Sequence, residues 1–85
     1  MEKLIELLKG IRDDVNFREC TTLVDEWILD SFDIVEIINV IDEEYDIEIP
    51  AIEIVPENFN SAEAILNMIQ RLQEEWILYL LWESI

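Results

Sequence analysis

Apolar residues recur at helical spacing in three segments of the 85-residue chain. In the first, about residues 2–15, one stripe is formed by Leu4, Leu7, Leu8, Ile11 and Val15. This stripe predicts a first helix. Residues 16–29 follow without a regular period, and we expect Leu23 and Trp27 to hold this long connection to the core.

A second helix is predicted to begin near Ser31. Asp30 is a good N-cap residue, and Asp33 stands at the reciprocal position of a capping box. The core-facing stripe of this helix comprises Ile34, Ile37, Ile38, Ile41 and Tyr45. The opposite face is expected to carry an aromatic ring and a valine among acids and an amide: Phe32, Val35, Glu36, Asn39, Asp42 and Glu43. Apolar groups on an exposed acidic face outline a binding surface.

Two further helices are predicted after residue 50. The sequence IEIP, residues 47–50, should end the second helix, because the residue before a proline avoids the α region. Pro56 suits the first turn of a short helix, PENF. Asn60 and Glu63 are expected to cap a last helix, whose stripe comprises Ile65, Ile69, Leu72, Trp76 and Tyr79. The fold class predicted by these segments is all-α.

The last helix is long for the rest of the fold. Continuous from 62 to 85, it would span roughly 36 Å, against about 22 Å for the second helix. Residues 76–82, WILYLLW, would then project with apolar groups on every side. Either the chain folds back near Glu74 and Glu75, or the tail packs on its own bundle, on a second copy through residues 76–85, or on a partner. We therefore divide the chain into a domain of residues 1–73 and an apolar extension of residues 74–85.

The charge of the chain restricts its partners. Twenty-one acidic residues against five basic ones give a net charge of −16, while the apolar fraction of 52% is too high for a disordered acidic tail. Nucleic acid is not an expected partner, and the acidity argues against direct insertion into lipid. A basic protein surface is the natural complement.

Cysteine usage indicates the compartment. Cys20 is the only cysteine, so the chain cannot form an internal disulfide, and a reducing cytosol is the simplest location. Residues 1–15 alternate charge with leucine and lack the continuous apolar core of a signal peptide. No run reaches the roughly 20 apolar residues of a membrane span. We expect a cytoplasmic protein.

Several kinds of active site are excluded by the residue types. The chain has no histidine, which removes the usual serine and cysteine hydrolase arrangements and most zinc sites. Acids between Asp42 and Glu53 fit several positions of a calcium-binding EF-hand loop, but Ile47 stands where that loop needs glycine, and Pro50 follows. We reject an EF-hand, keep loose divalent binding open, and assign no catalytic residue and no metal ligand.

Ser31 is the remaining candidate. A serine at a helix start commonly serves as the cap, but here Asp30 can cap, which leaves the hydroxyl free. A phosphate esterified to Ser31 would lie against the free N–H groups and the positive end of the helix dipole. The position therefore favours a phosphodiester. Another enzyme must form it, because the chain has no histidine to activate the hydroxyl.

Residues 29–50, LDSFDIVEIINVIDEEYDIEIP, resemble the acyl carrier protein family. The family pattern begins with Asp-Ser-Leu at the modified serine, continues with Val-Glu-Leu, and ends on a β-branched residue and proline. Ser31 falls on the modified serine, and the matching signature positions are Val35, Glu36, Ile37, Ile41, Tyr45, Ile49 and Pro50. The resemblance covers about residues 4–73. It implies a small four-helix bundle with three main helices and a short third helix.

The resemblance also implies a function, and the carrier itself is not an enzyme. Ser31 would carry a 4′-phosphopantetheine arm, installed from coenzyme A by a magnesium-dependent phosphopantetheinyl transferase, with Asp30 helping to hold the metal. An adenylating ligase would load an acyl or aminoacyl group on the arm as a thioester, and an acyltransferase or synthase with a basic docking surface would receive it. Partners of the family read the second helix, which assigns recognition to Phe32, Val35, Glu36, Asn39, Asp42 and Glu43.

The subtype suggested by the sequence is a D-alanyl carrier of cell-wall modification. The sequence LDSF is similar to those carriers, and residues 49–65 match them at Pro50, Glu53, Ile54, Glu57, Phe59, Asn60 and Ser61. Three departures weaken the match: Trp27 and Ile28 replace the usual glycine, no proline follows Ser61, and the tail from Gln73 has no counterpart. The alternatives are a carrier of fatty-acid synthesis and an unmodified acidic interaction module.

Overall fold

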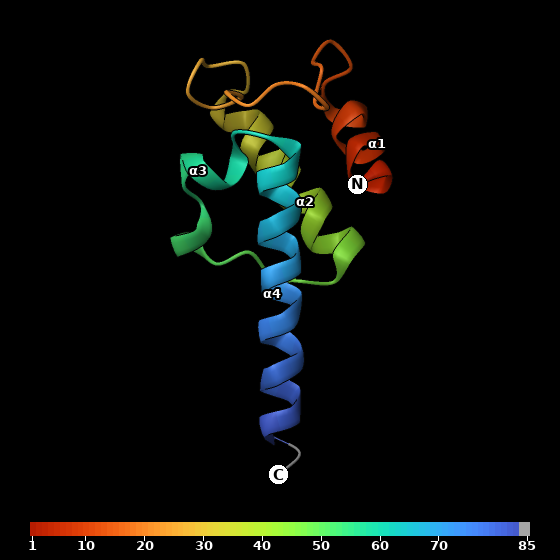
Figure 1. The fold of residues 1–85 in the computed structure, drawn as a ribbon, viewed down its shortest axis with the longest axis vertical. Coiled ribbons are helices and arrows are strands. Elements are labelled where there is room, and N and C mark those ends of the chain that lie inside the picture. The colour runs from red at the N-terminus through yellow and green to blue at the C-terminus, as the bar shows by residue number, and fades with distance from the viewer. Residues whose placement is uncertain (84–85) are drawn as a thin grey trace.

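The computed structural model describes the backbone of residues 1–83 and the side chains of residues 1–75, 81 and 82. Over this range the chain is helical, with no strand, and the all-α prediction is confirmed (Figure 1). The elements in chain order are α1 (Glu2–Ile11), α2 (Ser31–Tyr45), the 3-10 turn η1 (Ala51–Glu53), α3 (Pro56–Phe59) and α4 (Ala62–Glu83). Helix α1 contacts both α2 and α4, and α3 packs on α4.

Helix α1 is shorter than predicted. It ends at Ile11 rather than near residue 15, and Arg12 leaves the helix with extended backbone although its N–H still donates to the Leu8 carbonyl at 3.0 Å. The residues that follow, Asp13 and Asp14, favour helices weakly. Val15 is buried as predicted, but from the connection rather than from the helix.

Helix α2 begins as predicted and ends for a different reason. The capping box is present: Asp30 Oδ1 accepts from the Asp33 N–H at 2.8 Å, and Asp33 Oδ2 accepts from the Asp30 N–H at 3.2 Å. At the other end Asp46 adopts the left-handed conformation, with φ 52°, and its N–H donates to the Asp42 carbonyl. The helix therefore stops at Tyr45, before Pro50 can act on it.

The core lies between α1, α2 and α4. Of the predicted α2 stripe, Ile37 and Ile41 are fully buried, and Ile34, Ile38 and Tyr45 pack half-buried against the core. Helices α1, α3 and α4 and the connection contribute the other large buried side chains: Leu4, Ile5, Leu8, Phe17, Leu23, Phe59, Ile65, Met68 and Ile69.

The connection between α1 and α2 is fixed by Asn60, which the sequence predicts as a cap of α4. Asn60 does not cap α4; Ser61 does, because its Oγ accepts from the Ala64 N–H at 3.0 Å. Asn60 Oδ1 instead accepts from the N–H groups of Val24 and Asp25, both at 3.0 Å. The predicted anchor Leu23 is fully buried, and its N–H donates to the Asn60 carbonyl at 3.0 Å.

Helix α4 is continuous from Ala62 to Glu83, so the alternative of a fold-back near Glu74 and Glu75 is contradicted. Its C-terminal half extends beyond the other helices (Figure 1), and the molecule measures 47 × 23 × 20 Å. Leu81 and Trp82 are exposed, whereas the side chains of Trp76 and Tyr79, which we placed on the α4 stripe, lie outside the described residues. No helix in the described chain is long and apolar enough to cross a membrane.

Candidate functional site

Ser31 is the first residue of α2, and its side chain is exposed. The helix cap comes from the neighbouring Asp30, whose carboxylate accepts the Asp33 N–H. The Ser31 hydroxyl is therefore not needed to cap the helix. It lies where the first-turn N–H groups and the positive end of the helix dipole favour an attached phosphate.

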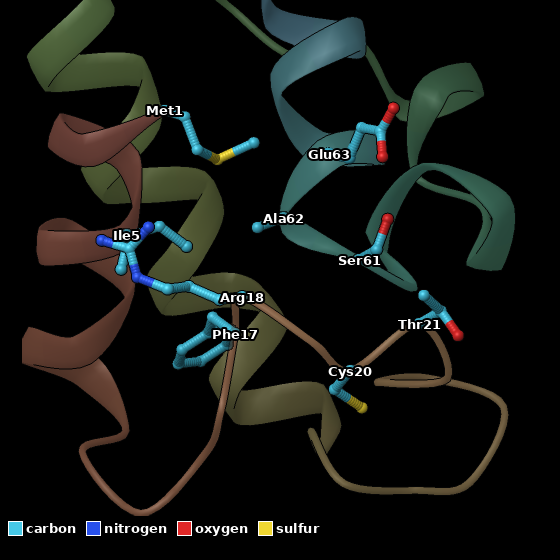
Figure 2. Close-up of a pocket in the computed structure, with 9 residues that line it drawn as sticks. All are labelled: Met1, Ile5, Phe17, Arg18, Cys20, Thr21, Ser61, Ala62 and Glu63. Atoms are coloured by element: carbon cyan, nitrogen blue, oxygen red, sulfur yellow. The ribbon is translucent and has the colours of Figure 1, made fainter.

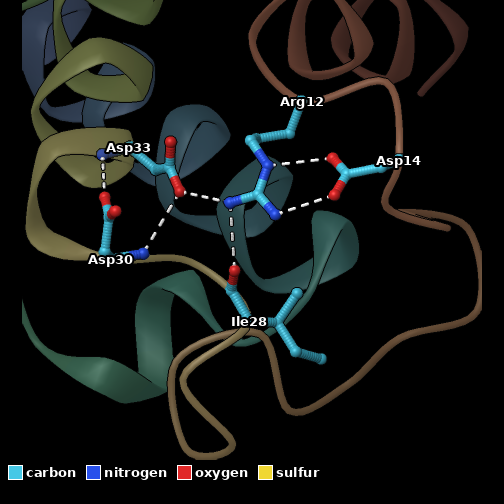
Figure 3. Close-up of polar contacts among 5 residues, drawn as sticks. All are labelled: Arg12, Asp14, Ile28, Asp30 and Asp33. Atoms are coloured by element: carbon cyan, nitrogen blue, oxygen red, sulfur yellow. Dashed lines mark hydrogen bonds and ion pairs between the residues drawn. The ribbon is translucent and has the colours of Figure 1, made fainter.

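An arginine from the end of α1 supports the turn that carries Ser31 (Figure 3). Arg12 Nη1 donates to Asp33 Oδ2 at 2.6 Å and to the Ile28 carbonyl at 3.2 Å. The Asp33 side chain is almost completely buried, with 7% of the residue exposed, so its carboxylate requires a partner. Since Asp33 also accepts from the Asp30 N–H, one guanidinium ties α1, the connection and the start of α2 together.

The same guanidinium is held on its outer side by Asp14. Arg12 Nε and Nη2 donate to the two Asp14 carboxylate oxygens, each at 2.9 Å, in a bidentate pair. Hydrogen bonds from Arg12 lower the pKa of Asp14, and those to Asp14 and Asp33 raise the pKa of Arg12. The arginine is thus fixed in place between two carboxylates.

Sequence reasoning did not identify Arg12, although a signal was present. Asp33 lies four residues before Ile37 and therefore on the core side of α2, where an acid needs a cation or several donors. The five basic residues of the chain were the only candidates for that cation.

The predicted recognition residues of α2 divide into two groups. Phe32 is 69% exposed and Val35 54%, and Asn39 and Glu43 are also exposed. Glu36 is half-buried. Helix α2 thus offers apolar and acidic side chains to solvent on the face that begins at Ser31.

Asp42 is half-buried, as Glu36 is, and it also accepts a hydrogen bond from the backbone. Its Oδ1 accepts from the Ile49 N–H at 3.2 Å and so closes the turn after α2. Burial raises the pKa of Asp42 above its usual range, although the hydrogen bond from Ile49 opposes the shift. The prediction of Asp42 as a fully exposed contact residue is therefore wrong, because Asp42 also holds the segment after α2 in place.

Trp27 contradicts the sequence prediction. It does not pin the connection to the core: 85% of the residue is exposed. Its backbone is in the left-handed region, with φ 59°, which costs a residue other than glycine about 1–2 kcal/mol. Glycine usually precedes the Asp-Ser pair in the carriers that this chain resembles, and the substitution of Trp27 and Ile28 there was the only sequence signal of an unusual turn.

A pocket of about 190 Å³ lies elsewhere, between the start of α1, the connection and the start of α4 (Figure 2). Ile5 and Phe17 are buried beside it, and Arg18, Cys20 and Ser61 also line it. Arg18 is already paired with Glu2. Ser31 is not among the lining residues, so this pocket and the exposed serine are separate features.

The described residues do not assemble a metal site. No group of three or more aspartate, glutamate, cysteine or histidine side chains in this part of the chain is arranged to hold an ion. The acids considered for an EF-hand are spread over α2, its C-terminal turn and η1.

Comparison of the chain with protein-family models, with curated proteins and with solved structures found no significant match. The resemblance to acyl carrier proteins therefore rests on the residue pattern of the segment 29–50 alone.

Proposed function

We propose that this chain is a carrier protein that holds an acyl or aminoacyl group as a thioester on a 4′-phosphopantetheine arm attached to Ser31. The observation that carries the proposal concerns two adjacent residues: Asp30 caps α2, and Ser31 remains exposed at the first position of the helix. The all-α fold also supports the small four-helix carrier bundle, which the resemblance to acyl carrier proteins implies.

The surface around Ser31 suits a protein that binds several enzymes in succession. A net charge of −16 attracts basic docking surfaces and raises the rate of encounter more than the strength of binding. Phe32 and Val35 add a small exposed apolar area to that acidic face. A tethered thioester also gains effective concentration at each partner's active site.

The expected partners follow from this chemistry. A phosphopantetheinyl transferase installs the arm with magnesium, for which Asp30 supplies a carboxylate beside the serine. An adenylating ligase loads the cargo, and an acyltransferase or synthase removes it. A single half-buried cysteine fits the reducing cytoplasm that we propose as the location. The cargo that we favour is D-alanine, with a fatty acyl group as the alternative.

The test is the mass of the purified protein after incubation with coenzyme A, magnesium and a broad-specificity phosphopantetheinyl transferase. The wild type should gain one phosphopantetheine, and Ser31→Ala should gain none. Ser61→Ala is the matched control, since Ser61 also stands at a helix start but caps it; this variant should still be modified. An unmodified wild type would favour the acidic interaction module instead.

A further inference from the structure

Trp27 combines two unfavourable features. It is 85% exposed, and φ 59° places a bulky aromatic residue in a backbone conformation that such residues rarely adopt. A ring in solvent gains little packing energy to offset the strain. Strained backbone of this kind persists where the surrounding structure enforces it and clusters at binding sites.

The backbone before Trp27 is fixed by hydrogen bonds. The N–H groups of Val24 and Asp25 donate to Asn60 Oδ1, each at 3.0 Å, and the Trp27 N–H donates to the Val24 carbonyl at 3.0 Å. Leu23, at the start of this turn, is fully buried. The turn is therefore attached to the segment that precedes α4.

The backbone after Trp27 is fixed as well. The Ile28 carbonyl accepts from Arg12 Nη1 at 3.2 Å, and the Leu29 N–H donates to the Leu23 carbonyl at 2.9 Å. Leu29 is buried, with 2% exposed. Because the chain is anchored on both sides, Trp27 presents its ring on a pre-organised backbone, and binding through it needs little further ordering.

Trp27 is also close to the attachment site. Ser31 lies four positions after Trp27 in the chain, so their Cα atoms are at most about 14 Å apart. A standard protein interface covers about 800 Å² on each partner, a patch roughly 30 Å across. An interface of this size centred on the Ser31 hydroxyl is therefore wide enough to include Trp27. Asp25, Glu26 and Asp30 are exposed around it, so the complementary surface is an apolar socket with a basic rim.

We infer that Trp27 is an anchor residue for the phosphopantetheinyl transferase that modifies Ser31. The inference rests on the proposed carrier function and adds to it a contact outside α2. The transferase takes the indole ring into an apolar socket, while basic groups on its rim face the neighbouring acids. Tryptophan is one of the residue types enriched among the few side chains that dominate interface energies.

The test is steady-state kinetics of a broad-specificity transferase with the full-length apo-protein as the varied substrate. Trp27→Asn removes the ring but keeps a residue that tolerates the left-handed conformation, so its melting temperature should equal or exceed that of the wild type. The KM for the carrier should rise roughly tenfold or more, with kcat changed less than about twofold. Trp82→Asn, which removes another exposed tryptophan near the end of α4, should leave KM unchanged.

Trp27→Phe provides the conservative comparison, because it keeps an aromatic ring and should recover most of the wild-type KM. An unchanged KM for Trp27→Asn would overturn the inference. A lower melting temperature together with a matching fall in kcat would also overturn it, because Trp27 would then be structural. A wild type that the transferase leaves unmodified would instead refute the carrier function itself.

Discussion

At the scale of single residues, the proposed function of Ser31 depends on which of two adjacent side chains, Asp30 or Ser31, caps α2. The local pattern around Asp30 was sufficient to predict the cap, because both members of the capping box lie within one helical turn. For the pair Asn60 and Ser61 the local pattern was not sufficient. Both residue types are good caps, and only the fold shows that Asn60 is used by the distant backbone of Val24 and Asp25.

The assignment of the cap gives a prediction about stability. Asp30→Ala should lower the free energy of unfolding by about 1 kcal/mol, because the Asp33 N–H loses its acceptor. Ser31→Ala should change it by less than about 0.5 kcal/mol, as is usual for an exposed surface position. Denaturant titration of the two variants at pH 7 measures both values. A larger loss for Ser31→Ala than for Asp30→Ala would mean that the hydroxyl is the cap.

Two residues of this region were not predicted correctly from the sequence. Arg12 was not identified, and Trp27 was predicted to hold the connection to the core. Arg12 reaches Asp33 across 21 positions of the chain, and no local pattern specifies a pair at that separation. Trp27 was expected to hold the connection to the core, but in the hydrogen-bonded turn its backbone is left-handed and its ring is exposed. Long-range contacts decide both outcomes.

At the scale of elements, helical periodicity predicted the existence of every main helix. The interiors of α2 and α4 were well predicted because their buried positions repeat at helical spacing. The ends were not: α1 stops four residues early, and α2 stops at the left-handed Asp46. Element ends depend on capping and on tertiary hydrogen bonds, which the apolar pattern does not contain.

Asp42 gives a prediction for the C-terminal turn of α2. Burial raises the pKa of Asp42, so the folded protein binds this proton more tightly than the unfolded chain, and ionisation at neutral pH lowers stability. Asp42→Asn keeps an acceptor for the Ile49 N–H without the charge. Its free energy of unfolding at pH 7 should therefore exceed that of the wild type.

The matched control for Asp42 is Glu43→Gln, which removes one charge from an exposed neighbouring position of the same helix. The free energy of unfolding at pH 7 should increase less for Glu43→Gln than for Asp42→Asn. The advantage of Asp42→Asn should disappear as the pH falls toward 3.8, the usual pKa of the group, because the wild-type carboxyl is then protonated too. Denaturant titrations across this pH range would contradict the account if Asp42→Asn were less stable than Glu43→Gln at pH 7.

At the scale of the whole molecule, charge and shape define two regions. The bundle carries the acidic face that begins at Ser31, and the C-terminal half of α4 extends away from it (Figure 1). The sequence left open whether α4 continues past Glu75 or folds back, and the structure has it continuous to Glu83. What packs on the apolar end of α4 stays a prediction. Self-association through residues 76–85 is one of the alternatives.

The net charge of −16 predicts that salt stabilises the fold. Added potassium chloride screens the repulsion among the acidic groups, so the melting temperature should rise between low and moderate ionic strength. For a chain of this size, each kcal/mol of repulsion removed raises the melting temperature by roughly 4–8 °C. Magnesium should have a larger effect at equal concentration. A flat response in thermal unfolding would show that the repulsion is weak.

The central claim is that Ser31 is the point of attachment of a phosphopantetheine arm. The most direct measurement is peptide-level mass spectrometry of the wild-type protein after reaction with coenzyme A and a transferase, with an established carrier domain in the same reaction. The account predicts one arm per chain, located on Ser31. Modification of the established carrier while this chain remains bare would contradict it.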